Sequence, residues 1–127
     1  MRLSIVLLLS IVVTPSYAND VEILDVKLEK KRSSWTARVT LKHEDTGWDH
    51  YADGWRIVSS SGKEIAKRVL YHPHVHEQPF TRSLADIKLA ENAVVYIEAH
   101  DNVHGWSPNR VKVDLSRKGG HKYQVFK

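Results

Sequence analysis

The chain has 127 residues, no cysteine, and a formal net charge of +4, from 19 lysines and arginines against 15 acidic residues. The charge excess is small and the basic residues are scattered, which argues against a nucleic-acid-binding surface. Without cysteine the chain can form no disulfide, and a metal site would have to use nitrogen and oxygen ligands.

The first 18 residues have the pattern of a secretory signal peptide. Arg2 gives a short cationic start, residues 3–13 form an apolar run, and a Ser-Tyr-Ala sequence ends at Ala18. The apolar run is too short for a membrane span, which needs about 20 residues. We therefore expect cleavage after Ala18 and a soluble, monomeric, exported protein, periplasmic or secreted, with no transmembrane segment in the mature chain.

After this segment the sequence predicts an all-β domain. Short stretches alternate apolar and polar side chains, as strands with one face on a core do, and no stretch has the period of an amphipathic helix. The strand-like stretches are residues 21–30, 34–43, 55–59, 64–71, 81–89, 94–99 and 110–115. The apolar positions that we expect on inward faces are Leu24, Val26 and Leu28 in the first stretch, Trp35, Ala37, Val39 and Leu41 in the second, and Ile65, Val69 and Leu70 in the fourth. The turn at 60–63 makes the third and fourth stretches a predicted hairpin.

About seven short strands at this spacing predict an antiparallel β-sandwich. Residues 94–106, which read V-V-Y-I-E-A-H-D-N-V-H-G-W, resemble the sixth strand and following turn of fibronectin type III or immunoglobulin-like domains. The resemblance is short and bears on the fold alone. We place the sandwich domain at residues 19–116 and a basic tail at 117–127, which either adds an edge strand or stays loose.

Residues 71–82 carry histidines at every second position. His72, His74 and His76 share one face if the segment is extended. Pro73 and Pro79 favour extension, because each fixes its own φ and keeps the preceding residue out of the helical region. Imidazoles on one face can ligate a single metal ion, although usually two bind and a third ligand comes from elsewhere.

Strand order predicts where the histidines gather. In an antiparallel sandwich, successive connections alternate between the two ends of the domain. The connections 44–54, 72–80 and 101–109 should therefore share one end, which we call the histidine pole. Seven of the eight histidines belong to it: His43, His50, His72, His74, His76, His100 and His104. Only His121, in the tail, lies elsewhere.

We predict a metal site at the histidine pole. His72 and His74 would bind Cu(II) or Zn(II) with His50 or His104, because imidazole without thiolate suits these ions. Further ligands or outer partners would come from His43, His76, His100, Asp49, Glu77 and Asp101. Carboxylates there can fix imidazole tautomers, but they are also ordinary turn residues, and a purely structural polar pole remains the alternative.

Aromatic side chains lie in the same connections and suggest a second class of function. Trp48, Tyr51, Phe80 and Trp106 could cover a metal site or form an apolar binding face. The alternative to metal binding is an immunoglobulin-like interaction module for an envelope protein or ligand. We rank an enzyme last, as a metal-assisted hydrolase with Glu77 or an aspartate as base, because no serine elbow, phosphate loop or HExxH motif is present.

Three longer phrases carry a broader resemblance. They are H-x-D-T-G-W-D-H-Y-A-D-x-W at 43–55, H-P-H-V-x-E-Q-P-F-T-R-S-L at 72–84, and A-x-D-x-x-H-G-W at 99–106. They resemble a family of small, functionally uncharacterised exported bacterial proteins. The resemblance implies an exported bacterial protein and stresses His43, His50, His72, His74 and His104, while position 76 varies. It favours a site shared between loops and implies no activity.

Overall fold

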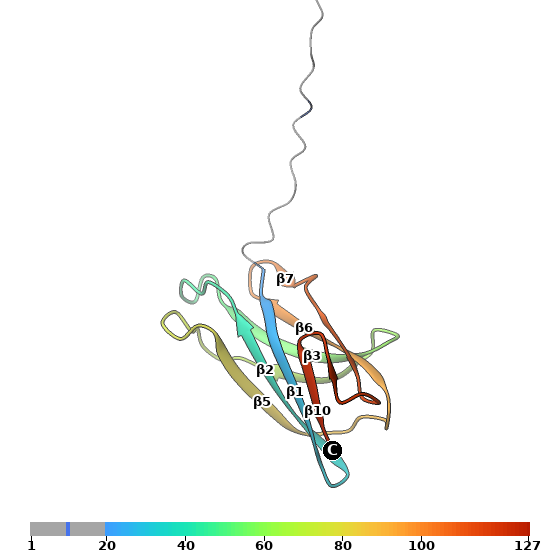
Figure 1. Cartoon of the computed structure of the whole chain (residues 1–127). Coiled ribbons are helices and arrows are strands. Elements are labelled where there is room, and N and C mark those ends of the chain that lie inside the picture. Colours follow the sequence, from blue (N-terminus) through green and yellow to red (C-terminus); the bar gives the residue numbers. More distant parts are fainter. Residues whose placement is uncertain (1–9, 11–19) are drawn as a thin grey trace, which may run out of the picture.

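The computed structural model describes residue 10 and residues 20–127, and in these residues ten strands form two sheets (Figure 1). The strands are β1 (Glu22–Lys31), β2 (Ser34–Lys42), β3 (Ala52–Ser59), β4 (Glu64–Val69), β5 (Phe80–Ile87), β6 (Val94–Asp101), β7 (Gly105–Trp106), β8 (Val111–Asp114), β9 (Gly119–Gly120) and β10 (Tyr123–Phe126). The predicted signal peptide lies, apart from residue 10, outside the described residues. Within those residues no helix has the length and hydropathy to cross a membrane.

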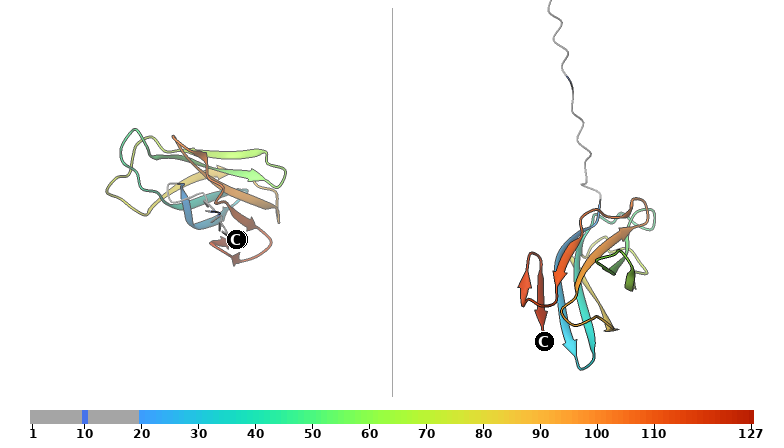
Figure 2. Two further views of the ribbon diagram at one scale, coloured as in Figure 1. Left: turned by 90° about the horizontal axis from the view of Figure 1, so that it is seen from above. Right: turned by 90° about the vertical axis from the view of Figure 1, so that its right-hand side faces the viewer.

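The two sheets pack as a β-sandwich, which confirms the predicted fold class (Figure 2). The first sheet has the order β5-β2-β1-β10-β9. The second has the order β4-β3-β6-β7, and β8 also pairs with β6. All pairings within these sheets are antiparallel except that of β1 with β10, which is parallel.

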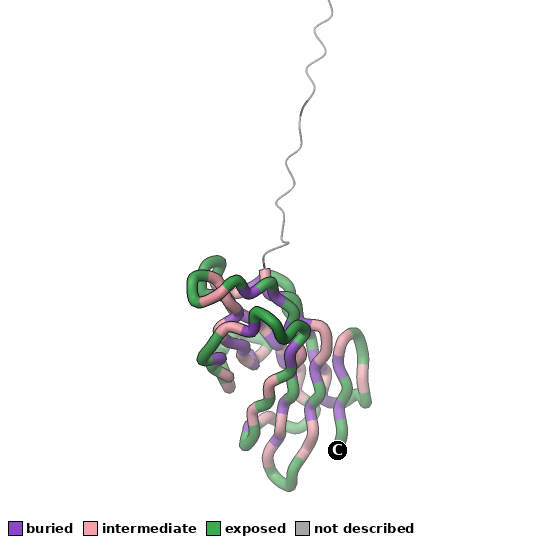
Figure 3. The backbone as a smooth tube through the Cα atoms, turned by 90° about the vertical axis from the view of Figure 1, so that its left-hand side faces the viewer, coloured by how far each residue is buried: buried purple, intermediate pink, exposed green. Residues whose placement is uncertain are grey.

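The alternation predicted for β2 is confirmed. Its inward side chains Trp35, Ala37, Val39 and Leu41 are all buried, and the intervening residues are not. Figure 3 shows how buried and more exposed positions follow one another along the strands. This alternation is what a strand with one face on the core requires.

In β1 the predicted inward face is partly wrong. Leu24 was expected to share a face with Val26 and Leu28, but Ile23 is buried instead and Leu24 is only half-buried. The register with β2 shifts between Ile23 and Asp25. Such a bulge inserts one residue and so reverses the side-chain alternation beyond it.

The predicted hairpin of β3 and β4 is also confirmed, and Gly62 takes the left-handed conformation its turn needs, with φ of +87°. Two apolar positions of β4 differ from expectation, because Ile65 and Val69 are exposed. β4 is an edge strand, and Ala66 is its side chain that packs against the core.

The segment 117–127 is part of the sandwich rather than a separate tail. It contributes β9 and β10, and β10 runs beside β1 with Val26 opposite Tyr123. Tyr123 and Val125 are buried in the core. Gly120 lies directly against the Tyr123 ring, so that a larger residue there would collide with it. The sandwich, predicted to end at residue 116, therefore continues to Phe126.

The three connections of the histidine pole meet at one end of the sandwich. The His43 amide donates to the side-chain oxygen of Gln78 at 3.0 Å, which joins the β2–β3 and β4–β5 connections. The Tyr51 amide donates to the side-chain oxygen of Asn102 at 2.9 Å, which joins the β2–β3 connection to the turn after β6. Hydrogen bonds thus hold together the loops that strand order brings to one end.

Candidate metal centre

Two strands carry polar side chains onto the inward face at the histidine pole. Beyond Leu41 of β2, the same alternation places His43 and Asp45 inward, with 3% and 4% of their surface exposed. In β6 the inward series runs through Ala99 to Asp101, which is 1% exposed. An imidazole and two carboxylates are therefore buried where apolar residues would continue the core.

Asp45 fixes the ring of His43. Its Oδ1 lies 2.6 Å from Nδ1 of His43, and because a carboxylate only accepts, Nδ1 donates. In the neutral ring Nε2 then carries the lone pair, and it faces Asp101, 3.9 Å from Oδ2. Asp45 also accepts hydrogen bonds from the amides of Ala52 at 3.0 Å and His74 at 2.8 Å. Asp45 thus holds the orientation of His43 in the way outer carboxylates orient metal-binding histidines.

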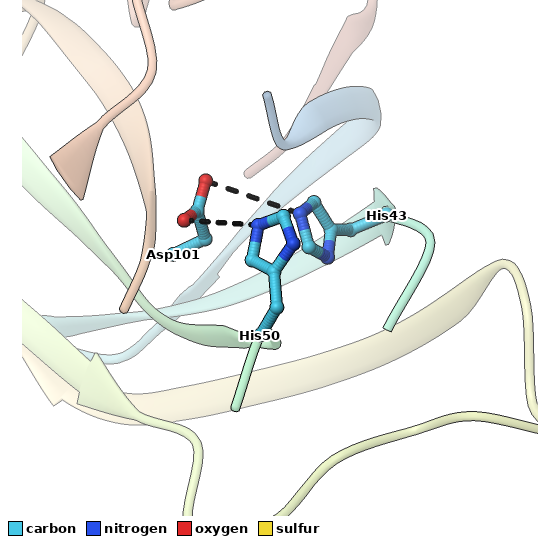
Figure 4. A group of neighbouring side chains, drawn as sticks. All are labelled: His43, His50 and Asp101. Atoms are coloured by element: carbon cyan, nitrogen blue, oxygen red, sulfur yellow. Dashed lines mark ion pairs between the residues drawn. The ribbon is translucent and has the colours of Figure 1, made fainter. Parts of the chain in front are cut away.

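Asp101 faces the imidazoles of His43 and His50 (Figure 4), and it also contacts that of His104. Its Oδ1 is 3.3 Å from Nε2 of His50, and its Oδ2 is 3.2 Å from Nδ1 of His104. Burial acts to raise the pKa of Asp101, but the amide hydrogen bonds from His104 and Val103 and the His104 side chain together outweigh it and lower the pKa. The buried carboxylate is therefore an anion.

His50 comes from the β2–β3 connection and lies between two other imidazoles. Its ring centroid is 4.7 Å from that of His43 and 4.9 Å from that of His104, in edge-to-face arrangements. Its Nε2 is buried and has no hydrogen-bond partner among the described residues, although it faces Asp101. A buried nitrogen without a partner is costly unless a ligand occupies it.

The described residues form two groups whose ligand atoms could hold a metal ion. In the first, His43, His50 and Asp101 each offer an atom within 4.8 Å of the others. In the second, Asp20, Asp101 and His104 do the same. Ligand atoms about 2.1 Å from one ion lie up to about 4.2 Å apart, so small side-chain movements would close either group. We call the five residues the Asp101 cluster.

The predicted ligands His72 and His74 belong to neither group. His74 is buried and stacks on Phe80, with ring centroids 4.0 Å apart and planes 11° from parallel. Its Nε2 lies 2.9 Å from Arg82, and because a guanidinium only donates, the ring accepts. Burial, and then the charge of Arg82, lower the pKa of His74.

Arg82 also pairs with the exposed Glu77, Nη1 to Oε1, at 3.2 Å. The ring of His72 lies 4.6 Å from that of His74. We call His72, His74, Glu77, Phe80 and Arg82 the His74 cluster. In this cluster Nε2 of His74 points at the guanidinium cation of Arg82 rather than at a carboxylate. This environment disfavours a metal ion at the lone pair of His74.

The other predicted residues lie around these two clusters. His100 pairs through Nδ1 with Asp53 and packs edge-on against Trp106, with centroids 4.8 Å apart. His76 and Asp49 are exposed. The backbone carbonyl of Asp49, rather than its carboxylate, accepts from Asn102.

The four predicted face aromatics are not equally exposed. Phe80 is 2% exposed and is a core residue, because it lies beneath His74. Trp48 is 66% exposed, whereas Tyr51 and Trp106 are half-buried. An apolar face at this pole therefore centres on Trp48.

Sequence reasoning did not single out Asp45 or Asp20. Asp45 has a recognisable signal, since it continues the inward alternation of Leu41 and His43. The same alternation also predicts that His43 and Asp101 are buried, which makes them stronger candidate ligands than the exposed histidines. Asp20 has no such pattern, because its place beside His104 depends on how the whole sheet folds.

Comparison with known proteins places the chain in no family. No family model matches it. A protein of Halomicrobium mukohataei named "Putative lipoprotein" is 39% identical over 77 residues, which are 60% of this chain and 37% of that protein. The chain thus spans little more than a third of the length of this curated relative. A superoxide reductase (neelaredoxin) from Ignicoccus hospitalis has 15% identity and a TM-score of 0.49 over 87% of this chain and 86% of that one.

Proposed function

We propose that the protein is an exported metal-binding protein that holds Cu(II) or Zn(II) in the Asp101 cluster. The observation that carries the proposal is the convergence of His43, His50 and Asp101. These residues come from the end of β2, the β2–β3 connection and the end of β6, and their ligand atoms lie within 4.8 Å of one another.

The electrostatics of the cluster favour a cation. Asp101 is buried and its pKa is lowered, so it presents a negative charge away from bulk water. Hydrogen bonds keep this carboxylate ionised, and a bound metal ion would neutralise the buried charge. Asp45 holds the His43 ring in place before the ion arrives, which reduces the conformational entropy lost on binding.

The donor set narrows the choice of ion. Two imidazoles and a carboxylate suit Cu(II) and Zn(II) better than the hard ions Mg(II) and Ca(II), which prefer all-oxygen ligands. For a given nitrogen and oxygen site, Cu(II) binds more tightly than Zn(II). We therefore expect copper to bind with the higher affinity and zinc to bind measurably.

Two observations support an exported location. Residues 1–18 have the signal-peptide pattern, and the similar protein of Halomicrobium mukohataei carries the name of a lipoprotein. An exported chain without cysteine would offer a metal ion the same nitrogen and oxygen ligands in any redox environment.

A matched pair of histidine variants tests the proposal. Calorimetric titration of the metal-stripped protein with Cu(II) and Zn(II) should show binding that His50→Ala weakens by at least about 100-fold, because a ligand is lost. His72→Ala removes an exposed histidine of the same pole and should change the affinity by less than about 3-fold.

The reverse pattern, with His72→Ala abolishing binding and His50→Ala leaving it intact, would contradict the proposal. It would instead support the site predicted from the alternation of His72 and His74. Binding by the metal-stripped protein no tighter than that of a surface histidine would rule out both sites. Circular dichroism of each variant should confirm that it folds.

One observation favours a second candidate, the metal-independent interaction module. Trp48 is 66% exposed and lines an open groove of about 640 Å³ with residues 72–77. Exposed tryptophans are characteristic of binding surfaces. A partner from the cell envelope should then bind equally well with and without chelator and lose affinity with Trp48→Ala, whereas a partner that dissociates on chelation would contradict this function.

A further inference from the structure

The two groups of ligand atoms share one residue. His43 and His50 lie in the first group, Asp20 and His104 lie in the second, and Asp101 belongs to both. From this arrangement we infer that the cluster binds two divalent cations, bridged by the carboxylate of Asp101. The inference rests on the proposed function, since it adds a second ion beside the proposed one.

The carboxylate of Asp101 faces imidazoles of both groups. Oδ1 has Nε2 of His50 at 3.3 Å, and Oδ2 has Nδ1 of His104 at 3.2 Å and Nε2 of His43 at 3.9 Å. A carboxylate placed between the two groups can bridge two ions. Pairs of metal ions in proteins are commonly about 3.5–4 Å apart, a separation that a single carboxylate spans.

A single ion fits the five residues less well. The ligands of one ion must all lie close to one another, within about 4.2 Å for bonds of about 2.1 Å. In the described chain the five residues satisfy even the wider limit of 4.8 Å only as two sets of three. With two ions, every residue of the cluster is a ligand, and neither group of three has to move toward the other.

The charges in the second group also call for a cation. Asp20 and Asp101 present carboxylate oxygens within 4.8 Å of each other. A divalent ion between them would turn a repulsion into two attractions.

Space for the remaining ligands lies beside the cluster. His43 and Asp20, one from each group, line the same surface cavity of about 500 Å³. His121, the histidine expected far from the pole, lines it too, as do Lys42 and Arg110. Each ion has three protein ligands, and this cavity offers room for the waters or small anions that would complete its coordination.

Stoichiometry tests the inference. The metal-stripped protein, loaded with excess Zn(II) and desalted, should retain two ions per chain by elemental analysis. Asp20→Asn and His104→Ala should each retain one, because the first group stays complete. Asp49→Asn removes an exposed acid from the same pole and should retain two.

Copper gives an independent readout of the bridge. With two Cu(II) ions loaded, spin coupling through Asp101 should broaden or weaken the electron paramagnetic resonance signal per copper. Asp20→Asn should restore the signal of an isolated Cu(II) ion.

The outcomes separate this inference from the proposed function. One ion in the unsubstituted protein, unchanged in Asp20→Asn, would overturn the second site and leave the first. No retained ion would overturn both. Two ions that persist in Asp20→Asn would show that the second ion binds outside the cluster, and would also overturn the inference.

Discussion

The Asp101 cluster and the His74 cluster are both rich in histidine and lie at the same end of the sandwich, yet they suit opposite chemistry. In the Asp101 cluster the imidazole nitrogens face a buried carboxylate. In the His74 cluster Nε2, which carries the lone pair, faces the guanidinium of Arg82, while Nδ1 lies 4.0 Å from Asp45 and the ring stacks on Phe80. The group that faces the lone pair decides whether a histidine can receive a cation.

Asp45 connects the two clusters. One of its oxygens accepts from the His43 ring and the other from the His74 amide. It therefore orients the His43 ring of the Asp101 cluster and anchors the backbone of the His74 cluster. Variants at and around Asp45 can show whether the two clusters are as different as their geometry indicates.

Among the variants that compare the two clusters, the largest effect is expected from Asp45→Asn. Loss of the negative acceptor should release the His43 ring, and metal affinity should fall by about 10–100-fold. The melting temperature should fall as well, because three hydrogen bonds to a buried charge are weakened. Calorimetry and thermal unfolding measure the two effects.

Asp53→Asn is the matched control for this variant. Asp53 pairs with His100 at the same pole, but neither residue belongs to the Asp101 cluster. The affinity for metal should stay within about 3-fold of the unsubstituted protein, since no oriented ligand is lost. An equal loss of affinity in both variants would mean that general loosening of the pole, and not the His43 orientation, controls binding.

A moderate effect is expected from His74→Phe, and it should appear in the pH dependence of stability. The pKa of His74 is lowered in the folded state, so below about pH 6.5 the unfolded chain takes up a proton that the folded protein does not. The free energy of unfolding of the metal-free protein should thus decline as the pH falls, by at most about 1.4 kcal/mol per pH unit from this one proton.

Urea unfolding at pH 7.5, 6.5, 5.5 and 4.5 measures this decline, and His74→Phe should make it shallower. Asp101 contributes little to the slope in this range, because the stability that its lowered pKa provides is lost mainly as the pH falls below the ordinary aspartate value of about 3.9. Metal affinity at pH 7.5 should be retained. A strong loss of affinity in His74→Phe would erase the distinction between the clusters.

The smallest effect is expected from Arg82→Gln. Removing the guanidinium should raise the pKa of His74 only part of the way to its ordinary value, because burial, the larger cause of the lowering, remains. Titration of the His74 ring by nuclear magnetic resonance measures this. Lys88→Gln, the same change of charge at an exposed site, should leave the pKa of His74 where it is, and an unchanged pKa in Arg82→Gln would contradict the assigned contact.

Much of the fold and the place of the site follow from local sequence patterns. Alternation in residues 34–43 predicts both the strand and its buried face, and strand order predicts that the histidine-bearing connections meet. The choice among the histidines does not follow from spacing. His72 and His74 have the more regular pattern, but the fold sets Arg82 and Phe80 against His74.

Other features depend on contacts between distant parts of the chain. The bulge in β1 is visible only in its register with β2. Asp20 reaches His104 and Asp101 only because β1 starts beside the turn that follows β6 (Figure 1). The sequence could indicate a polar, histidine-rich end of the sandwich, whereas the identity of the five clustered residues needs the tertiary structure.

The parallel pairing of β1 with β10 has a consequence for the order of assembly. Asp20 lies just before β1, and the parallel partner of β1 is β10, which is far from it in the sequence. Contacts between residues so far apart in sequence form late in folding, because a long loop must close first. β1 therefore gains its second neighbour only once residues 123–126 have folded back beside it, and we expect the proposed ion at Asp20 to enter late in folding.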